Sequence, residues 1–292
     1  MIVARVEVSN PDKVLFADGT TKLALAKYYQ AVAAIMVPYL ADRPISMQRF
    51  PDGISEPGFY EKTVPTHFPT WVDTVKVDTA DDVQCQVAVN DARSLVYLAD
   101  QACITIHTWL SRARALESPD QLIFDLDPSV DDLAKVRRAT AMTGELLDEI
   151  GLTSFVKTTG SRGYHVMVPL RQRETFDETR EFAKEVAQVL VGRAPELLTC
   201  EQRKANRGDK VYLDVARNGY GQTAVSPYAV RALPGAPVST PIEWYELDRV
   251  APDEFTVATI PGRLSRRGDA WHGMRRRAHG LDRARDKLSR LS

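Results

Sequence analysis

Short apolar segments alternate with longer amphipathic segments along most of the chain. Thr20 and Thr21 precede the apolar-rich segment KLALAKYYQAVAAIM, which predicts a first helix that cannot run past Pro38. Further helices are predicted over 90–102 and 131–150. A fourth helix is predicted from Thr175 to about Val191, because Thr175 and Glu178 form a capping-box pattern at its start. Strands are predicted over 45–50, 71–77, 84–89, 103–110, 121–127, 153–159, 164–170, 211–215 and 223–231.

This order of elements predicts the fold class. Strands outnumber the helices that could connect them, and the strands at 153–159 and 164–170 are joined by a short turn that contains glycine. We therefore expect an α+β fold with mixed or antiparallel central sheets and flanking helices, rather than a doubly wound parallel sheet. The proline-rich stretch at 234–241 is a candidate boundary that would introduce a C-terminal helical appendage.

The composition is that of a soluble globular protein, with 44% hydrophobic and 26% charged residues among 292. The start of the sequence lacks a leader pattern, and the longest apolar run, at 31–40, is interrupted by Pro38 and is too short to span a bilayer, so we expect a cytoplasmic protein. Cys85, Cys103 and Cys200 are widely spaced without a CxxC pattern, which predicts buried free thiols rather than disulfides or a zinc site.

Charge is unevenly distributed along the sequence. The net charge is −1, but residues 262–292 carry ten Lys and Arg against three Asp, giving +7, so the preceding residues carry −8. This asymmetry is compatible with a local phosphate-binding surface. A solvated C-terminal helix explains it equally well.

Two aspartates in LIFDLDPS form the first candidate site. Asp125 and Asp127 stand two apart at the end of a predicted strand, so both carboxylates project from the same face. Adjacent carboxylates are costly unless a cation neutralises them, and Mg²⁺ or Mn²⁺ prefers such oxygen ligands. Taken alone, the pair is more simply explained as a strand end, with Asp127 starting a turn.

Asp214 strengthens the metal hypothesis. It lies within the β-branched and aromatic strand VYLDV, where an unpaired acid is disfavoured. Three strand carboxylates could hold two divalent ions for phosphoryl transfer. Between the two motifs, the segment TTGSRGYH (158–165) offers hydroxyls, Arg162 and backbone N–H groups that suit phosphates. By itself this segment is a weak signal, because any hairpin turn uses Gly and Ser.

The motif series DLDP, TGSRGYH and VYLDVARNGYGQTAVSPYAVR resembles that of the primase-polymerases of bacterial nonhomologous end joining. These are the polymerase domain of ligase D and its stand-alone relatives, within the archaeo-eukaryotic primase superfamily. NPDKVLF, GFYEK (58–62) and ITIHTW (104–109) resemble the family in the same order, so the likeness extends over nearly the whole chain. It implies one domain with an N-terminal DNA- and template-binding part (1–110), a primase-polymerase-like catalytic core (111–260) and a basic helical appendage (261–292).

The resemblance also implies roles for individual residues. The metal ligands would be Asp125, Asp127 and Asp214, and the incoming triphosphate would be bound by Thr159, Ser161, Arg162 and His165 with His107 and Arg231. Lys13 and Lys22 would bind a DNA 5′-phosphate, although solvated surface charge is an open alternative. Phe59 and Tyr60 would stack on a template base, with core packing as the alternative, and Arg49 would reach the template backbone. The basic loop would hold a 3′ overhang through Arg203, Lys204, Arg207 and Lys210.

The family implies template-directed addition of nucleotides, preferably ribonucleotides, to 3′ ends at DNA gaps and breaks. Two divalent ions, Mn²⁺ or Mg²⁺, would be the cofactors, nucleoside triphosphates the substrates, and Ku and a separate or fused DNA ligase the partners. Arg162, Thr159 and Tyr60 replace the Lys, Ser and Phe common in relatives, which affects nucleotide preference more than activity. No KxDG motif is present, so this chain cannot seal a nick.

Two other functions remain open at this point. A non-catalytic module that aligns DNA ends for a ligase would bind DNA without metal or nucleotide. A metal-dependent phosphohydrolase is a weaker hypothesis, because Ser129 stands where the DxDxT pattern requires threonine.

Overall fold

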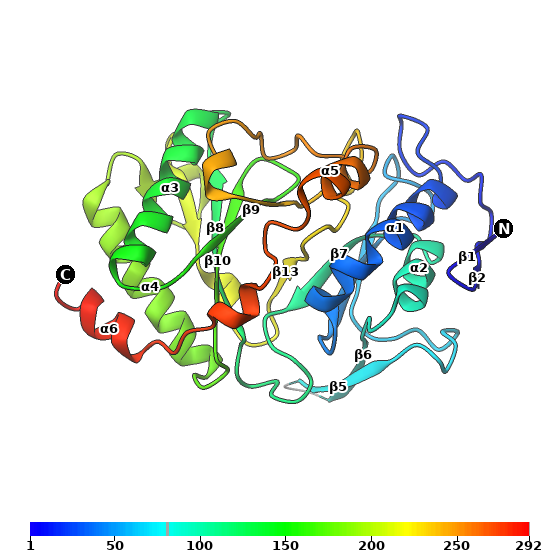
Figure 1. The fold of residues 1–292 in the computed structure, drawn as a ribbon, viewed down its shortest axis with the longest axis horizontal. Helices are drawn as coiled ribbons and strands as arrows, with labels where there is room; N and C mark the ends of the chain where they lie inside the picture. Colours follow the sequence, from blue (N-terminus) through cyan, green and yellow to red (C-terminus); the bar gives the residue numbers. More distant parts are fainter. Residues whose placement is uncertain (80–81, 292) are drawn as a thin grey trace. The chain divides into compact units, whose positions relative to one another are not determined.

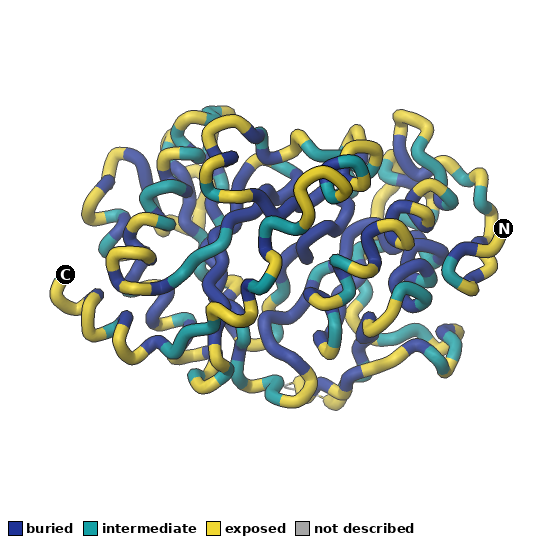
Figure 2. Tube along the Cα trace, in the orientation of Figure 1, coloured by how far each residue is buried: buried dark blue, intermediate teal, exposed yellow. Residues whose placement is uncertain are grey.

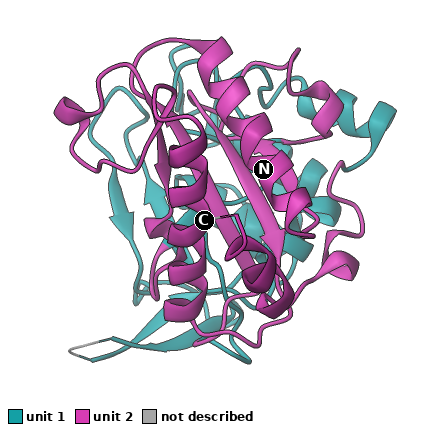
Figure 3. Ribbon diagram, turned by 90° about the vertical axis from the view of Figure 1, so that its left-hand side faces the viewer, with its two compact units in different colours: residues 1–116, 223–240, 253–269 teal, residues 117–222, 241–252, 270–292 magenta. Residues whose placement is uncertain are grey.

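The computed structural model describes residues 1–79 and 82–291 as two compact units (Figures 1 and 3). Unit 1 comprises Met1–Leu116, Thr223–Thr240 and Asp253–Asp269, and unit 2 comprises Glu117–Gln222, Pro241–Pro252 and Ala270–Ser292. The terminal Ser292 of the predicted appendage lies outside the described residues. Each unit contains its own six-stranded sheet. The division of one domain into parts 1–110, 111–260 and 261–292 stays a prediction.

Unit 1 is built on an antiparallel sheet in the order β13-β7-β3-β6-β5, with β4 paired to β3. Its strands are β3 (Ile45–Arg49), β4 (Phe59–Glu61), β5 (Thr74–Asp78), β6 (Val83–Val87), β7 (Cys103–Trp109) and β13 (Thr223–Val225). The small pair β1 (Ile2–Val3) and β2 (Val6–Glu7) and the helices α1 (Lys22–Leu40), α2 (Ala92–Asp100) and α5 (Ile260–Arg267) complete it.

Helix α1 begins where the sequence predicts but ends later. The Thr21 side chain accepts a hydrogen bond from the N–H of Ala24, and the helix continues through Pro38 to Leu40. The expectation that it stops before Pro38 is therefore wrong. Proline in the last turn removes a single helical hydrogen bond, and the Arg43 and Arg112 guanidiniums donate to the carbonyls of Tyr39 and Ala41 just beyond it.

By length and composition α1 is also the one helix, among the residues that the structure describes, that could cross a membrane. Half of its most apolar window is nevertheless buried within the protein. The hydroxyls of Tyr28 and Tyr29 donate to the carbonyls of Tyr228 and Ile104 at 2.8 and 2.6 Å. These contacts are those of a core helix, and the cellular location stays a prediction.

Unit 2 is built on a mixed sheet in the order β11-β12-β8-β10-β9-β14, in which only β11 and β12 are parallel. Its strands are β8 (Gln121–Pro128), β9 (Phe155–Thr158), β10 (Tyr164–Pro169), β11 (Leu198–Thr199), β12 (Val211–Asp214) and β14 (Pro241–Ile242). Its helices are α3 (Leu133–Glu149), α4 (Phe176–Arg193), α6 (Asp282–Leu288) and the 3₁₀ turns η1 (Lys204–Asn206), η2 (Ala216–Asn218), η3 (Trp244–Glu246) and η4 (Met274–Arg277).

The core of unit 2 lies between this sheet and helices α3 and α4. Leu122, Phe124, Val166 and Val168 of the central strands are fully buried, and burial follows these strands in Figure 2. The predicted capping box at the start of α4 is present, with the Thr175 side chain and the Glu178 carboxylate each bonded to the other's backbone N–H. The sheet thus has its register fixed on one side by a well-packed apolar layer.

Three local expectations differ from the structure. The segment predicted as strand over 223–231 is a strand only at Thr223–Val225, because Pro227 cannot donate to a sheet and Tyr228 has a φ of 65°. The proline-rich stretch 234–241 does contain a boundary, because the chain passes from unit 1 to unit 2 between Thr240 and Pro241, but it leads into β14 of the unit 2 sheet and not directly into a helical appendage. All three cysteines are free, but only Cys103 is buried, whereas Cys200 is exposed.

Candidate active site

A row of four charged or titratable residues crosses the sheet of unit 2. The antiparallel register places Asp214 of β12 opposite Asp125 of β8, Asp125 opposite His165 of β10, and His165 opposite Lys157 of β9. Directly opposed residues in antiparallel strands carry their side chains on the same face of the sheet. Asp127 stands two residues after Asp125 in the same strand, so its side chain projects from that face as well. The three predicted aspartates are therefore on one face, which we call the carboxylate face.

Asp125 lies at the centre of this row. The Nε2 atom of His165 is 3.3 Å from its Oδ1, and His165 itself is buried. Burial acts to raise the pKa of Asp125, but the charge and hydrogen bond of His165, with the nearby cations Arg217 and Lys157, outweigh it and lower the pKa. The Asp125 carboxylate is therefore held ionised.

Asp127 experiences the opposite effect. Burial raises its pKa, and the neighbouring carboxylates of Asp125 and Asp214 raise it further, whereas Arg162 and Arg207 act to lower it. The Asp214 carboxylate is held by the backbone just after β12, because its Oδ1 accepts a hydrogen bond from the N–H of Ala216 at 2.8 Å. Asp127 is therefore the carboxylate of this face that is least favoured in its ionised form.

The donor set fits hard divalent cations, although the side chains do not form a complete cage. Within residues 1–79 and 82–291, no group of three or more His, Cys, Asp or Glu side chains is arranged so as to hold a metal ion as it stands. Mg²⁺ typically uses one or two carboxylates and completes its shell with water and substrate phosphates. Asp125, Asp127 and Asp214 offer such oxygens, and a cation would relieve the repulsion that raises the pKa of Asp127.

The turn between β9 and β10 closely approaches the backbone of β8. The Thr159 hydroxyl donates to the carbonyl of Gly163 at 2.9 Å and accepts from its N–H at 3.3 Å, and Gly160 has a φ of 66°. A Cβ atom on Gly163 would lie 2.0 Å from the carbonyl oxygen of Leu126, so only glycine permits this approach. Ser161 and Arg162 are the more accessible residues of the turn, and the charge of Arg162 reaches Asp127.

Lys157 and Arg217 belong to this site although the sequence analysis did not select them. Lys157 is fully buried in the row, and the Nε of Arg217 is 3.9 Å from Oδ2 of Asp214. A lysine inside the strand-like segment SFVKTT is a detectable anomaly, because a lysine is rarely buried without partners. Its partners come from three other strands, however, so local pattern alone could not reveal them.

The basic loop 203–210 is joined to the same face through Arg207. This guanidinium lies 3.7 Å over the ring of Tyr212 and donates to the carbonyls of Glu201 and Gln202. Tyr212 is in turn hydrogen-bonded to Asp214, and burial and that carboxylate raise its pKa to about 12. Arg203 and Lys204 are exposed and Lys210 is partly buried.

In unit 1 the predicted template residues form a separate group. Phe59 and Tyr60 on β4 are 45% and 60% exposed, which excludes the alternative that they are core residues. The Arg49 guanidinium lies 5.6 Å from the centre of the Phe59 ring, and the Tyr60 ring meets that of His107 edge-on at 5.6 Å. His107 therefore lies beside the exposed aromatic pair.

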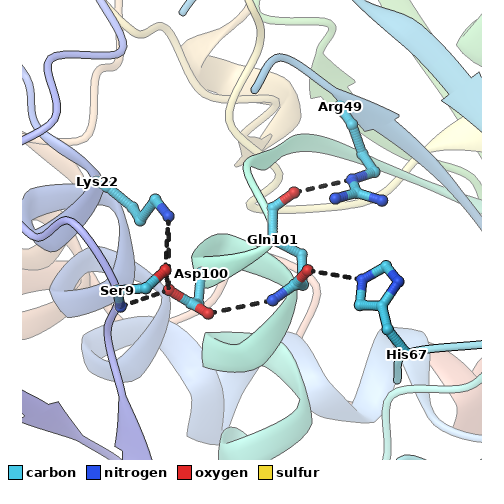
Figure 4. Close-up of polar contacts among 6 residues, drawn as sticks. All are labelled: Ser9, Lys22, Arg49, His67, Asp100 and Gln101. Atoms are coloured by element: carbon cyan, nitrogen blue, oxygen red, sulfur yellow. Dashed lines mark hydrogen bonds and ion pairs between the residues drawn. The ribbon is translucent and has the colours of Figure 1, made fainter. Parts of the chain in front are cut away.

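Lys13 and Lys22 are brought together by the backbone, where the N–H of Lys22 donates to the carbonyl of Lys13 at 2.8 Å. Lys13 forms an ion pair with Asp52 at 2.9 Å. The Lys22 ammonium is buried, 3.1 Å from Oγ of Ser9 and 3.5 Å from Asp100, as Figure 4 shows. Each lysine is thus already matched by a carboxylate.

The predicted nucleotide-binding residues are divided between the units. Thr159, Ser161, Arg162 and His165 lie in unit 2, whereas His107 and Arg231 lie in unit 1. The N–H of Arg231 donates to the carbonyl of Pro237 at 2.7 Å, which fixes the chain shortly after β13. Within unit 2 the four residues cluster at one hairpin beside the carboxylate face.

Together, the fold and the carboxylate face define a class: an α+β protein with strand carboxylates and a glycine-rich cationic turn suited to phosphates and divalent ions. Residues 21–271 match the model of the LigD primase-polymerase domain, and the chain belongs to this family. The family predicted from the motifs is thus confirmed.

Individual relatives agree with this assignment. The multifunctional non-homologous end joining DNA repair protein LigD of Mycobacterium tuberculosis is 33% identical over 280 residues, 91% of this chain and 36% of that protein. LigD of Pseudomonas aeruginosa is 33% identical over 267 residues, 89% of this chain and 31% of its own. The chain thus spans about a third of the length of these relatives.

A solved structure has the same fold. The polymerase domain from Mycobacterium tuberculosis ligase D, in complex with DNA, superposes with a TM-score of 0.88 at 31% identity. The alignment covers 94% of this chain and 99% of that one. The predicted mixed α+β fold is confirmed by this match.

Proposed function

We propose that this protein is a template-directed primase-polymerase that adds nucleotides to 3′ ends at DNA gaps and double-strand breaks during end joining. The observation that carries the proposal is the register that sets Asp214 opposite Asp125, with Asp127 on the same face. The names of the relatives support it, because they are end-joining proteins and one solved relative is a polymerase domain bound to DNA.

Asp125, Asp127 and Asp214 would hold two divalent ions, Mn²⁺ or Mg²⁺. When bound, such ions lower the pKa of an attacking hydroxyl and stabilise the charge on the departing pyrophosphate. The residues around the carboxylates have their own tasks. His165 fixes the position of Asp125 through the 3.3 Å contact, and Asp214 is held by the N–H of Ala216.

The triphosphate of the incoming nucleotide would lie against the β9–β10 turn. Arg162 and Ser161 are accessible there, Lys157 adds positive charge to the adjacent sheet, and His165 lies beside it in the row. Thr159 shapes the turn through its two hydrogen bonds to Gly163 and so presents the backbone to the phosphates. His107 and Arg231 would complete this binding set.

DNA would be bound by residues of both units. Phe59 and Tyr60 would stack on a template base, since aromatic stacking tolerates any base, with Arg49 at the template backbone. Lys13 and Lys22 would meet a 5′-phosphate, and the basic loop would hold a 3′ overhang through Arg203, Lys204, Arg207 and Lys210. A preference for ribonucleotides, and Ku and a separate or fused ligase as partners, belong to the same proposal.

The test is primer extension on gapped DNA that carries a 5′-phosphate, with Mn²⁺ or Mg²⁺ and either rNTPs or dNTPs. Asp214→Ala should reduce extension about 100-fold or more, because charge stabilisation by a metal is worth several kcal/mol and about 1.4 kcal/mol is tenfold in rate. Asp131→Ala is the matched control, because this aspartate is exposed and outside the carboxylate face.

The outcomes separate the candidate functions. Equal extension by wild type and Asp214→Ala would show that the metal assignment is wrong. Wild-type protein that binds DNA regardless of metal and nucleotide, without extending it, would instead support the end-alignment module. Phosphate release without polymerisation would support a phosphohydrolase.

A further inference from the structure

A basic cavity lies in unit 2, next to the chain that follows β10, at the opposite end of this strand from His165. It has a volume of about 640 Å³ and is lined by the chain at 150–152, by Arg171 and Arg173, and by residues of the segment 279–287. From His165 to Arg171 the chain advances six residues, or roughly 20 Å at the rise of a β-strand. The cavity is therefore separate from the carboxylate face.

Four cations converge on this cavity from two parts of the sequence. Arg171 and Arg173 follow β10, whereas Arg283 and Lys287 lie on α6, which is red in Figure 1. A Cβ atom on Gly151 would lie 2.8 Å from Nζ of Lys287, so this ammonium projects over Gly151 at the cavity wall. Part of the excess positive charge at 262–292 thus lies at the same cavity as the two arginines that follow β10.

These cations lack carboxylate partners. Among the described residues, no Asp or Glu lies within ion-pair distance of Arg171, Arg173, Arg283 or Lys287, and Asp282 is the one acid that lines the cavity. Elsewhere in unit 2, exposed cations such as Arg193 and Lys184 do have such partners. Four like charges around one cavity repel one another, and an anion with several negative charges would relieve this.

The walls of the cavity are fixed by backbone hydrogen bonds. The N–H of His279 donates to the carbonyl of Pro169, and that of Arg171 donates to the carbonyl of His279, both at 2.9 Å. Nε2 of His279 accepts from the N–H of Thr153 at 3.0 Å. Burial, with the charge of Arg171, lowers the pKa of His279, so the imidazole is neutral. The cavity thus has walls that are held in place by hydrogen bonds and a volume typical of ligand pockets, which distinguishes it from a group of solvated surface side chains.

We propose that this cavity is a second phosphate-binding site, which takes adjacent phosphate groups either of a DNA strand or of a free oligophosphate. Its room exceeds one phosphate, and the guanidiniums of Arg171, Arg173 and Arg283 provide paired N–H donors that match phosphate oxygens. The site goes beyond the proposed polymerase activity, because its occupation requires neither divalent metal nor nucleotide transfer.

The test compares two double variants of equal charge. Arg283→Ala/Lys287→Ala removes two cations of the cavity, and Arg276→Ala/Arg277→Ala removes two exposed arginines of the same basic segment that do not line it. Binding of fluorescein-labelled oligothymidylate is measured by anisotropy at several salt concentrations, without divalent metal. Tripolyphosphate binding is measured by calorimetry under the same conditions, where the bare carboxylate face repels it.

The cavity variant is expected to bind oligothymidylate about tenfold more weakly. The slope of the logarithm of its binding constant against the logarithm of salt concentration should fall by about one to two, while the control pair stays near wild type. Loss of tripolyphosphate binding with unchanged oligothymidylate binding would identify a free oligophosphate as the ligand. Arg283→Lys/Lys287→Arg, which keeps both charges, should restore binding. Equal effects of the two double variants, or no effect on either probe, would overturn the proposal.

Discussion

Each unit contains a buried polar cluster built around a lysine, and the two clusters differ in their charge balance. In unit 1, Lys22 meets Asp100 at 3.5 Å, and Asp100 also accepts from the N–H and the hydroxyl of Ser9, both at 2.8 Å. In unit 2, Lys157 shares its row with His165 and two aspartates, and Asp127 adds a third carboxylate. The first cluster pairs one ammonium with one carboxylate, whereas the second gathers three carboxylates on one face, with cations from several elements around them.

This difference separates a cluster whose charges are matched within the protein from one that gathers charges of the same sign. The Lys22 ammonium is already matched by Asp100 and Ser9, so a 5′-phosphate at Lys22 would have to compete with these contacts. Burial and the carboxylates of Asp125 and Asp214 raise the pKa of Asp127, so its ionised form is destabilised until a cation arrives. The gathering of carboxylates on an otherwise well-packed sheet therefore distinguishes the carboxylate face better than burial does.

The largest expected effect comes from Asp127→Asn, which removes the most repelled carboxylate. Nucleotide addition should fall about 100-fold or more, while the thermal unfolding midpoint should stay equal to wild type or rise, because two like-charge contacts are relieved. Primer extension and thermal unfolding without metal are the measurements. A lower midpoint would show that the face is a structural cluster like that of unit 1.

Lys22→Met should have the converse effect, on stability. It leaves the Asp100 carboxylate buried without its cation and should lower the free energy of unfolding by about 3 kcal/mol. Urea unfolding measures this, and Lys27→Met on the exposed face of α1 is the control, with a change within about 0.5 kcal/mol. If Lys22→Met unfolds like its control, the cluster of unit 1 is not the self-satisfied structure described above.

Lys157→Met should produce the smallest effect, and it tests whether the lysine of the unit 2 cluster contributes to nucleotide binding. Loss of this buried cation makes the carboxylate face more negative and should raise the KM for nucleotide about tenfold with little change in kcat, a difference of about 1.4 kcal/mol in binding. Lys157→Arg should restore part of the loss. Steady-state extension over a range of nucleotide concentrations tests this, and a fall in kcat at unchanged KM would contradict it.

The fold was largely predictable because its elements are marked locally. The alternating segments gave most strands within a few residues, and Thr175 and Glu178 marked the start of α4. The exceptions have non-local or positional causes. Pro38 lies in the final helical turn, where it is tolerated, and the nearby Arg43 and the distant Arg112 donate to the carbonyls of Tyr39 and Ala41 near that helix end.

The candidate site was predictable in its residue types but not in its pairings. Asp125, Asp127 and Asp214 are visible as acids in strands, and the structure sets them on one face. Lys157 joins them only because β9 pairs with β10, and β10 with β8, and nothing within SFVKTT indicates those partners. The roles of these residues in metal and nucleotide binding stay predictions.

The row across four strands also has a consequence for assembly. Asp125 and Asp214 are neighbours in space but are separated by most of unit 2 in sequence, so the pair cannot exist until non-local strands have met. A partly folded chain would have aspartates but no site. Any ligand that requires the whole row will therefore bind only the folded protein. Its binding will shift the folding equilibrium towards the folded state, so an occupied site indicates that unit 2 has folded.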